Sequence, residues 1–206
     1  MVNVKVSSVR YRVLVAMCLG LSAIPQAQAA PIYTFPIPTS AGCAPHYARY
    51  HHDYPANDIL AKKGCKYVAV TSGTIDEIRN VDTYNYKKPT PLTKGGIYVS
   101  FVGDDGVRYY GSHLSKIPSD IEPGVRVEAG HVIGFVGQSG DAKGLASHVH
   151  FGISWNTKDG IWWVRRGEIY PWKYLDLWKA GKDANPAAAV AKQEKKIGTV
   201  PAIPKY

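Results

Sequence analysis

The sequence contains no obvious hydrophobic run long enough to cross a bilayer as a helix. The apolar stretch over residues 13–24 has about a dozen residues, whereas a membrane-spanning helix needs roughly 20. Three basic residues precede this stretch, and residues 27–29 (Ala-Gln-Ala) follow it with the small-x-small pattern of a cleavage site. These features predict a signal peptide over residues 1–29, and therefore export. An uncleaved membrane anchor is the alternative interpretation.

Cysteine is scarce, which limits the kinds of metal site and cross-link that the chain can form. Of the three cysteines, Cys18 lies inside the apolar stretch after Met17, where lipidation is not expected, so cleavage leaves Cys43 and Cys65. The two lack the close C-x-x-C spacing of structural zinc sites. In an oxidising, exported setting an even pair predicts one disulfide, Cys43 to Cys65. This disulfide would enclose the histidine-rich segment between them.

The chain also lacks a recognisable nucleic-acid-binding motif and an internal repeat. Its formal net charge is +9, and this falls to +6 when the three basic residues of the signal peptide leave. A modestly basic exported protein suits an anionic polymer partner, and export argues against a nucleic acid. We expect no stable membrane insertion after cleavage. Charge alone identifies no partner.

Helix signals are few, and strand signals dominate from residue 67 onward. Only Pro171 to Lys179 has the pattern of a short amphipathic helix. Short alternating segments separated by turns predict a mainly β domain over residues 30–182, an antiparallel β-sandwich or barrel-like sheet. We expect strands at residues 67–71, 74–78, 96–102, 107–110, 131–137 and 148–155. Residues 30–45 are proline-rich and predict an extended lead-in, and the Ala/Lys/Pro-rich residues 183–206 predict a flexible tail.

The histidines gather where a catalytic metal site could form. His148 and His150 lie two apart on a predicted strand, so both imidazoles point to the same face. Residues 49–58 add two more histidines and Asp58, and His113 follows the predicted hairpin. Each feature alone has an ordinary interpretation: the histidines as surface residues, and Asp58 as a turn or cap residue.

Together these residue types match the needs of catalytic zinc. Such a site takes three His or Asp/Glu ligands and keeps a fourth position for water, whose pKa the metal lowers to about 7. A further imidazole can move protons during the reaction. The available ligands are His51 or His52 with Asp58 and His150, which leaves His113 and His148 for proton transfer.

These segments resemble the LytM/lysostaphin-type zinc endopeptidases, which cut peptide bonds in peptidoglycan. The family pattern is an early His and Asp, a middle H-L-S, and a late H-L-H-F after a glycine-rich stretch. Here the middle element is residues 113–115 (His-Leu-Ser), and the late one is residues 148–151 (His-Val-His-Phe). The resemblance covers roughly residues 46–155. It implies a β-sheet fold with a zinc site in a groove, and a hydrolytic reaction.

The resemblance also implies roles for individual residues. Asp58 and His150 match zinc ligands, and His113 and His148 match the two catalytic histidines. The usual H-x-x-x-D spacing would place the first ligand at residue 54, where this chain has Tyr. A sub-group with H-x-x-Y-P-A-x-D aligns His51 with the ligand instead, and His52 is the alternative.

The activity implied by this resemblance is that of an exported zinc metalloendopeptidase, DD-endopeptidase-like, with one Zn²⁺ per domain. It would hydrolyse amide bonds in peptidoglycan stem peptides or cross-bridges. The alternatives are a non-catalytic wall-binding or hydrolase-activating relative, and a zinc peptidase that acts on exported peptides or proteins. Export with a disulfide favours the periplasm over secretion or wall association. Five aromatic residues could line the groove or simply pack under loops: Tyr84, Tyr86, Trp155, Trp162 and Trp163.

Overall fold

The computed structural model describes Met1 and residues 32–204. The expected signal peptide, apart from Met1, lies outside these residues, as does its cleavage site. The described residues 32–204 belong to one compact unit. None of the helices in the described part of the chain is long and apolar enough to cross a membrane.

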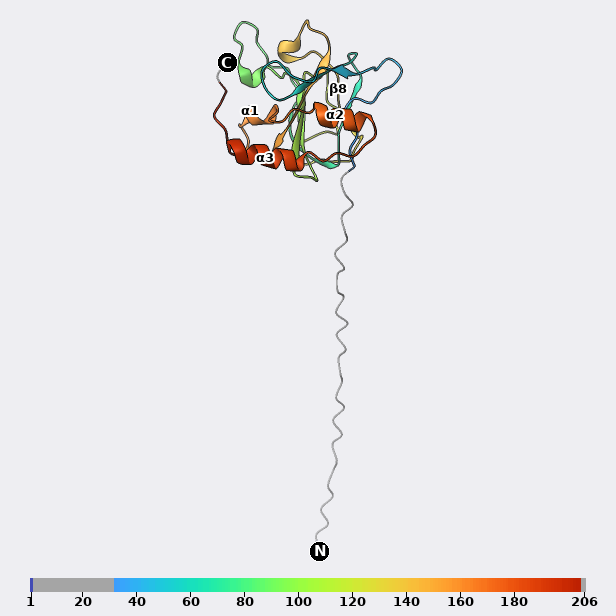
Figure 1. Ribbon diagram of the computed structural model, residues 1–206, viewed down its shortest axis with the longest axis vertical. Coiled ribbons are helices and arrows are strands. Elements are labelled where there is room, and N and C mark those ends of the chain that lie inside the picture. The colour runs from blue at the N-terminus through green and yellow to red at the C-terminus, as the bar shows by residue number, and fades with distance from the viewer. Residues whose placement is uncertain (2–31, 205–206) are drawn as a thin grey trace. The chain divides into compact units, whose positions relative to one another are not determined.

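A seven-stranded antiparallel sheet forms the body of the domain (Figure 1). Its spatial order is β1 (His46–Tyr47), β2 (Asn57–Leu60), β9 (His148–Trp155), β6 (Val107–Ser112), β5 (Tyr98–Gly103), β4 (Gly73–Arg79) and β7 (Arg126–Val127). A second, two-stranded sheet pairs β3 (Lys66–Val68) with β8 (Val132–Phe135). The mainly β, antiparallel fold expected from the strand pattern is confirmed, and the large sheet remains open.

Alternation along the central strands separates a core face from a polar face. On β9 the hydrophobic residues Val149, Phe151 and Ile153 are fully buried in the core cluster. The residues that alternate with them along β9, which include His148 and His150, therefore point to the opposite face. The neighbouring strand β6 follows the same rule, because Tyr109 lies in the core cluster. One face of the sheet thus supplies packing, and the other face is available for chemistry.

The segment that precedes β1 packs against the domain. Tyr33 stacks on Trp178 of α2 (Trp172–Lys179) with ring centroids 5.5 Å apart, and its hydroxyl donates to Asp105 at 2.7 Å. The backbone N–H of Thr34 donates to the carbonyl of Val70 at 2.8 Å. The start of the expected lead-in therefore contributes to the core while remaining outside helices and strands.

The expected disulfide between Cys43 and Cys65 is present, with Cα atoms 5.9 Å apart. It closes a loop with a sequence separation of 22 residues, and this loop contains His51, His52 and Asp58. In the chain-entropy account, closing a loop of this length stabilises the folded state by about 3 kcal/mol. The cross-link therefore restricts the segment that carries three of the candidate site residues.

The C-terminal segment differs from the flexible tail expected over residues 183–206. Residues Ala187–Ile197 form α3, which packs against β9, and Val190 is buried in the core cluster. Beyond the helix, the carbonyls of Thr199 and Pro201 accept hydrogen bonds from the indole nitrogens of Trp155 and Trp163. The low hydrophobicity of residues 183–206 did not indicate these contacts, which join Val190 and backbone carbonyls of the segment to the body of the domain.

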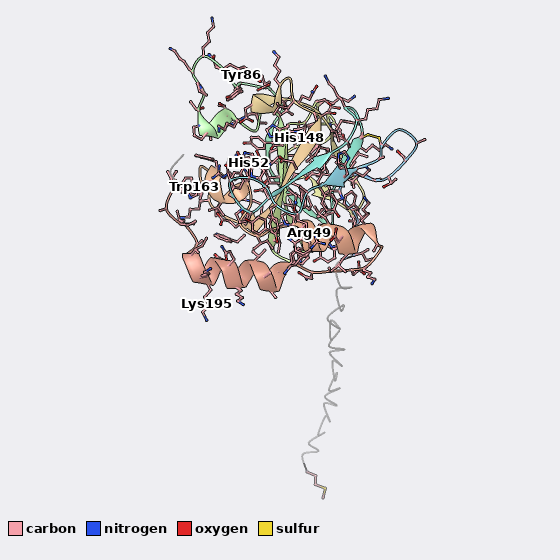
Figure 2. All side chains as sticks on the ribbon, turned by 45° about the horizontal axis from the view of Figure 1, so that its top comes forward. Arg49, His52, Tyr86, His148, Trp163 and Lys195 are labelled. Carbon is pink, nitrogen blue, oxygen red and sulfur yellow. A yellow bond between two sulfur atoms is a disulfide. The ribbon has the colours of Figure 1, made fainter. Side chains whose placement is uncertain are left out.

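We predict that Val190→Ala lowers the free energy of unfolding by about 1 to 3 kcal/mol, because it removes buried methyl groups from the core. The matched control is Lys195→Ala on the same helix, where Lys195 is exposed and points away from the domain in Figure 2. The control should change stability by less than about 0.5 kcal/mol. Urea denaturation of the mature protein measures both. Equal, negligible effects would show that the segment is loose in solution.

The half-buried carboxyl group of Glu168 makes the stability of the fold depend on pH. It follows α1 (Trp162–Arg165), its backbone N–H donates to the carbonyl of Ile153 at 2.9 Å, and its side chain is half-buried. Burial raises the pKa of Glu168 to about 7, although nearby Arg166 acts in the opposite direction. The folded state therefore holds this proton more tightly than the unfolded state. The contribution of this proton to the stability of the folded state is complete below pH ~4.5 and is lost as pH rises through about 7.

We predict that Glu168→Gln gains stability relative to the parent as pH rises. After allowance for solvent screening, the relative gain between pH 4 and pH 8.5 should be about 1 to 2 kcal/mol. Thermal or urea unfolding at both pH values measures it. A difference between the two proteins that does not change with pH would contradict the raised pKa.

Candidate active site

The site is built on the polar face of the sheet around His150. In the antiparallel register, His150 of β9 lies directly opposite Asp58 of β2 on one side and Ser112 of β6 on the other. Side chains of directly opposed residues point to the same face and lie close together. The His150 Nδ1 atom is accordingly 3.0 Å from the Asp58 Oδ1 atom. Strand register alone thus brings together two residues that are far apart in the sequence.

The loop before β2 adds His51 to this pair. The Nε2 atom of His51 lies 3.9 Å from Asp58 Oδ2, and its ring centroid is 4.9 Å from that of His150. One potential ligand atom from each of these three residues lies within 4.8 Å of the others. The His51 side chain is 7% exposed, whereas that of His52 is 74% exposed and pairs with Asp53. The structure therefore groups His51, and not His52, with Asp58 and His150.

The second nitrogen of His150 is held by the backbone. Its Nε2 atom lies 3.0 Å from the carbonyl oxygen of Arg166, which can only accept, so Nε2–H is the donor. In the neutral ring this leaves a bare lone pair on Nδ1 facing the Asp58 carboxylate. Two electron-rich atoms at 3.0 Å favour a cation between them, either a proton that makes Nδ1–H a donor to Asp58 or a metal ion. A metal-ligating histidine ordinarily donates its other N–H in this way.

Glycine at position 152 makes this contact sterically feasible. A Cβ atom at Gly152 would lie 2.2 Å from the carbonyl oxygen of Arg166. Without that Cβ, the end of α1 approaches β9 closely enough for its carbonyl to reach His150. A glycine in the middle of a strand therefore serves the site, although strand interiors usually disfavour it.

Burial and neighbouring groups set the charge of the cluster. Burial, followed by the neighbouring His150, lowers the pKa of His51 to about 4. Burial acts to raise the pKa of Asp58, but the hydrogen bond and charge of His150 outweigh it and hold that pKa below its usual range. Near pH 7, His51 is neutral and Asp58 is ionised. These are the protonation states that metal ligands require.

His113 and His148 form a second pair beside the cluster. Their ring centroids are 4.8 Å apart, and His113 lies 6.1 Å from His150 by the same measure. The Nδ1 atom of His113 donates to the carbonyl of Ser139 at 2.9 Å, and that of His148 donates to the carbonyl of Ala146 at 2.8 Å. Each neutral ring therefore keeps Nε2 as a proton acceptor while its orientation is fixed by the backbone.

The backbone at His113 is in a conformation that few non-glycine residues adopt. Its φ angle is +62°, and among the described residues it is the only non-glycine with positive φ. Its N–H donates to the carbonyl of Gly95 at 2.9 Å, which helps to hold the turn. Gly137 packs beside it, where a Cβ would lie 2.6 Å from the His113 carbonyl oxygen. Such strain persists where surrounding structure enforces it, often at functional sites.

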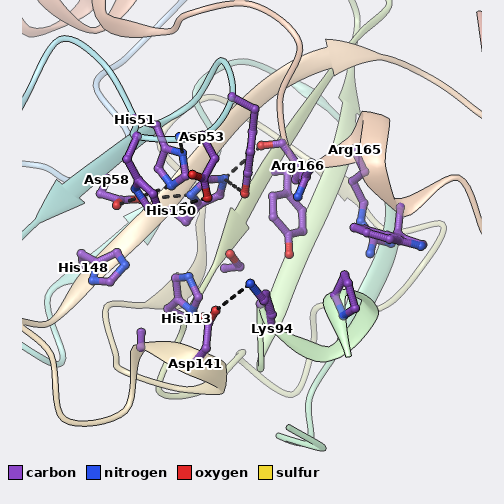
Figure 3. Close-up of a pocket in the computed structure, with 18 of the residues that line it drawn as sticks. His51, Asp53, Asp58, Lys94, His113, Asp141, His148, His150, Arg165 and Arg166 are labelled. Atoms are coloured by element: carbon purple, nitrogen blue, oxygen red, sulfur yellow. Dashed lines mark hydrogen bonds and ion pairs between the residues drawn. The ribbon is translucent and has the colours of Figure 1, made fainter. Parts of the chain in front are cut away.

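One pocket with a volume of about 240 Å³ is lined by His51, Asp58, His113, His148 and His150 (Figure 3). Asp58 and His148 lie on one side of the view, His113 lies below the cluster, and Arg165 and Arg166 lie on the far side. The sequence expectation did not include several other residues that line the pocket, because their types and spacing carry no motif. They include Lys94, Tyr110, Asp141, Arg165 and Arg166.

The sequence left open whether five aromatic residues line the groove or pack under loops, and the structure assigns them to different places. Trp162 lines the pocket. Trp155 is buried in the core cluster, and Trp163 packs against it and bonds to Pro201. Tyr84 and Tyr86 contact each other with ring centroids 4.7 Å apart, and the Tyr86 hydroxyl donates to the carbonyl of Gly140. Only Trp162 of these five therefore forms part of the pocket wall.

Known structures share this fold. A LytM protein from Ruminococcus gnavus superposes with a TM-score of 0.56 at 22% identity, over 74% of this chain and 62% of that one. Lysostaphin from Staphylococcus simulans gives 0.50 at 24% identity, over 84% and 60%. A Pseudomonas aeruginosa protein assigned to peptidase M23 gives 0.50 at 20%, over 73% and 53%. The matches therefore span about three fifths or less of the length of these three structures.

Sequence comparison identifies the family. No curated protein sequence matches the chain at a significant level. Residues 53–160, just over half of the chain, match the profile of Peptidase family M23. The matched region contains Asp58, His113, His148 and His150, and its N-terminal limit falls two residues after His51. The chain belongs to peptidase family M23.

Proposed function

We propose that this protein is an exported zinc metalloendopeptidase that hydrolyses amide bonds in peptidoglycan stem peptides or cross-bridges. The observation that carries the proposal is the cluster of His51, Asp58 and His150 in one pocket with the histidine pair His113 and His148. Residues 1–29 would direct export and then be removed, and the disulfide suits an oxidising compartment.

The donor set fits zinc. Two imidazoles and one carboxylate form a typical ligand set for catalytic zinc, and imidazole nitrogens suit this metal. In our proposal His51 offers Nε2, His150 offers Nδ1, and Asp58 offers a carboxylate oxygen. When bound there, Zn²⁺ acts as a Lewis acid and lowers the pKa of water toward 7. The Arg166 carbonyl keeps His150 in the tautomer that leaves Nδ1 available.

The remaining two histidines would handle protons. Each presents an unprotonated Nε2 on a ring whose Nδ1–H is held by a carbonyl, so each can accept a proton from water and return it to the leaving amine. Burial, followed by the nearby His150 and His148, lowers the pKa of His113 to about 3. In the metal-free protein this ring is therefore neutral near pH 7.

The proposed substrate class rests on similarity. Lysostaphin is described as an antimicrobial peptidase, and the Ruminococcus gnavus protein is named for glycyl-glycine endopeptidase activity. The family match covers the segments that carry four of the five proposed site residues. We therefore propose a wall peptide as the substrate of this pocket.

The adjacent residues His51 and His52 allow a test of the metal site in which one variant serves as the control for the other. We predict about one zinc per chain in the mature protein and in His52→Ala, and less than about a tenth of that in His51→Ala, because one of three ligands is lost. Metal analysis after dialysis measures the content, and circular dichroism checks folding. Equal zinc in both variants would rule out His51 as a ligand.

Replacing a histidine that transfers protons should lower activity without removing the metal. We predict that His113→Ala keeps its zinc but cleaves peptidoglycan about 10²- to 10⁴-fold more slowly, because general acid–base help is worth roughly that factor. The exposed His131 provides the control His131→Ala, which should retain full activity. Released peptides are quantified by mass spectrometry. Undiminished cleavage by His113→Ala would remove this residue from the mechanism.

A further inference from the structure

Two tyrosines and a tryptophan form an aromatic cluster on the surface of the domain. The ring centroid of Tyr50 lies 5.1 Å from that of Tyr170 and 6.4 Å from that of Trp172, and both contacts are edge-to-face. Tyr50 is 62% exposed and Tyr170 is 39% exposed. None of the three residues lines the pocket that holds the histidine cluster. Large apolar groups that are exposed together, and not singly, are typical of a binding surface.

The segment that carries Tyr50 is held in place on both sides. The hydroxyl of Tyr47 donates to Asp176 of α2 at 2.7 Å, and the buried side chain of Asn57 donates to a backbone carbonyl of the segment at 2.5 Å. The next residue, His51, lies in the cluster of proposed metal ligands. A surface fixed in this way loses little conformational freedom when it binds a ligand.

The other two rings belong to residues that follow α1. The backbone N–H of Ile169 donates to the carbonyl of Ile153 at 3.3 Å, and this bridge to β9 fixes the position of Tyr170. Trp172 is half-buried at the start of α2, and the guanidinium of Arg49 lies 4.5 Å from its ring centroid. This contact covers part of the indole and holds a cation beside the tyrosines. The two tyrosines therefore form the open platform, and the tryptophan supports it.

The chemistry and the size of this platform suit a sugar polymer. Tyrosine rings stack on the C–H faces of sugar rings, while phenol and guanidinium groups donate hydrogen bonds to hydroxyl and acetamido oxygens. An aromatic side chain buries about 150–250 Å². Two open rings thus fall well short of the roughly 800 Å² per partner that a stable protein interface needs. The area is sufficient for a short stretch of a sugar chain.

We propose that Tyr50 and Tyr170, with Arg49, form a platform that binds the glycan strand of peptidoglycan. The inference rests on the proposed function, because the glycan carries the peptide that the pocket would cleave. Tyr50 directly precedes His51, so the platform and the proposed metal site are continuous along the chain. An extended stem peptide of about five residues spans at most ~18 Å. A peptide bound at the metal site therefore keeps its glycan strand close to the platform.

Binding of a sugar without a peptide tests the platform separately from the metal and the reaction. The probe is a β-1,4-linked tetramer of N-acetylglucosamine, titrated into the mature protein by isothermal titration calorimetry. We expect the parent to bind it and Tyr50→Phe, which keeps the ring, to bind within about twofold. Tyr50→Ala and Tyr170→Ala should each bind roughly 3- to 10-fold more weakly, since one stacked aromatic ring is worth about that factor.

Tyr86 provides a matched control at another place on the surface. It is also an exposed tyrosine whose ring contacts that of a second tyrosine, Tyr84. In Figure 2, Tyr86 and Arg49 lie on opposite sides of His148. Tyr86→Ala should therefore bind the sugar like the parent.

A change in the neighbouring metal site is detected independently. The zinc content and the circular dichroism of Tyr50→Ala should match those of the parent, which would show that the position of His51 is preserved. If this variant loses zinc or fails to fold, Tyr170→Ala carries the test, because it lies outside the loop.

Absence of sugar binding by the parent, or equal binding by the parent and both alanine variants, would overturn the platform. Self-association is the competing use of such a surface, and sedimentation velocity detects it. A dimer of the parent that Tyr50→Ala abolishes would assign the cluster to a second copy of the chain and contradict glycan binding.

Cleavage assays separate the platform from the proposed function. Tyr50→Ala should raise the KM for intact peptidoglycan several-fold more than the KM for a glycan-free peptide of the same sequence. Sugar binding by a parent protein that cleaves neither substrate would support the platform and contradict the proposed function. Cleavage of both substrates without sugar binding would contradict the platform and leave the proposed function standing.

Discussion

The hydrogen bond from His150 to the carbonyl of Arg166 is the contact on which the rest of the site depends. It holds a buried imidazole in one orientation, with Nε2–H donating to the backbone and Nδ1 facing Asp58. It also ties the short helix α1 to the middle of β9, where Gly152 leaves room for the carbonyl. One backbone contact thus links the orientation of His150 to the position of α1.

Much of this arrangement could be predicted from the sequence, because period-2 alternation and turn residues report directly on strands. The spacing of His148 and His150 already placed both rings on one face of a strand. The proximity of Asp58 follows from sheet register, in which it lies directly opposite His150. The preference for His51 over His52 came from a family resemblance, and the structure brings His51 into the cluster through the fold of the loop.

Other features could not be read from sequence, since they depend on contacts between distant segments. Arg165 and Arg166 belong to no motif, and they contact Glu77 and Tyr54 from elsewhere in the chain. The composition after residue 182 indicated a loose tail, yet Val190 packs in the core. Low hydrophobicity over a whole segment says little about one side chain that finds a cavity to fill.

Zinc anomalous diffraction from crystals of the zinc-loaded mature protein tests the central claim most directly. The account predicts one zinc peak at about 2.0 to 2.2 Å from the ligand atoms of His51, Asp58 and His150. The Nε2 atom of His150 should still donate to the carbonyl of Arg166. A zinc ion held by His113 and His148, or by His52 and Asp53, would contradict the assignment of the metal site.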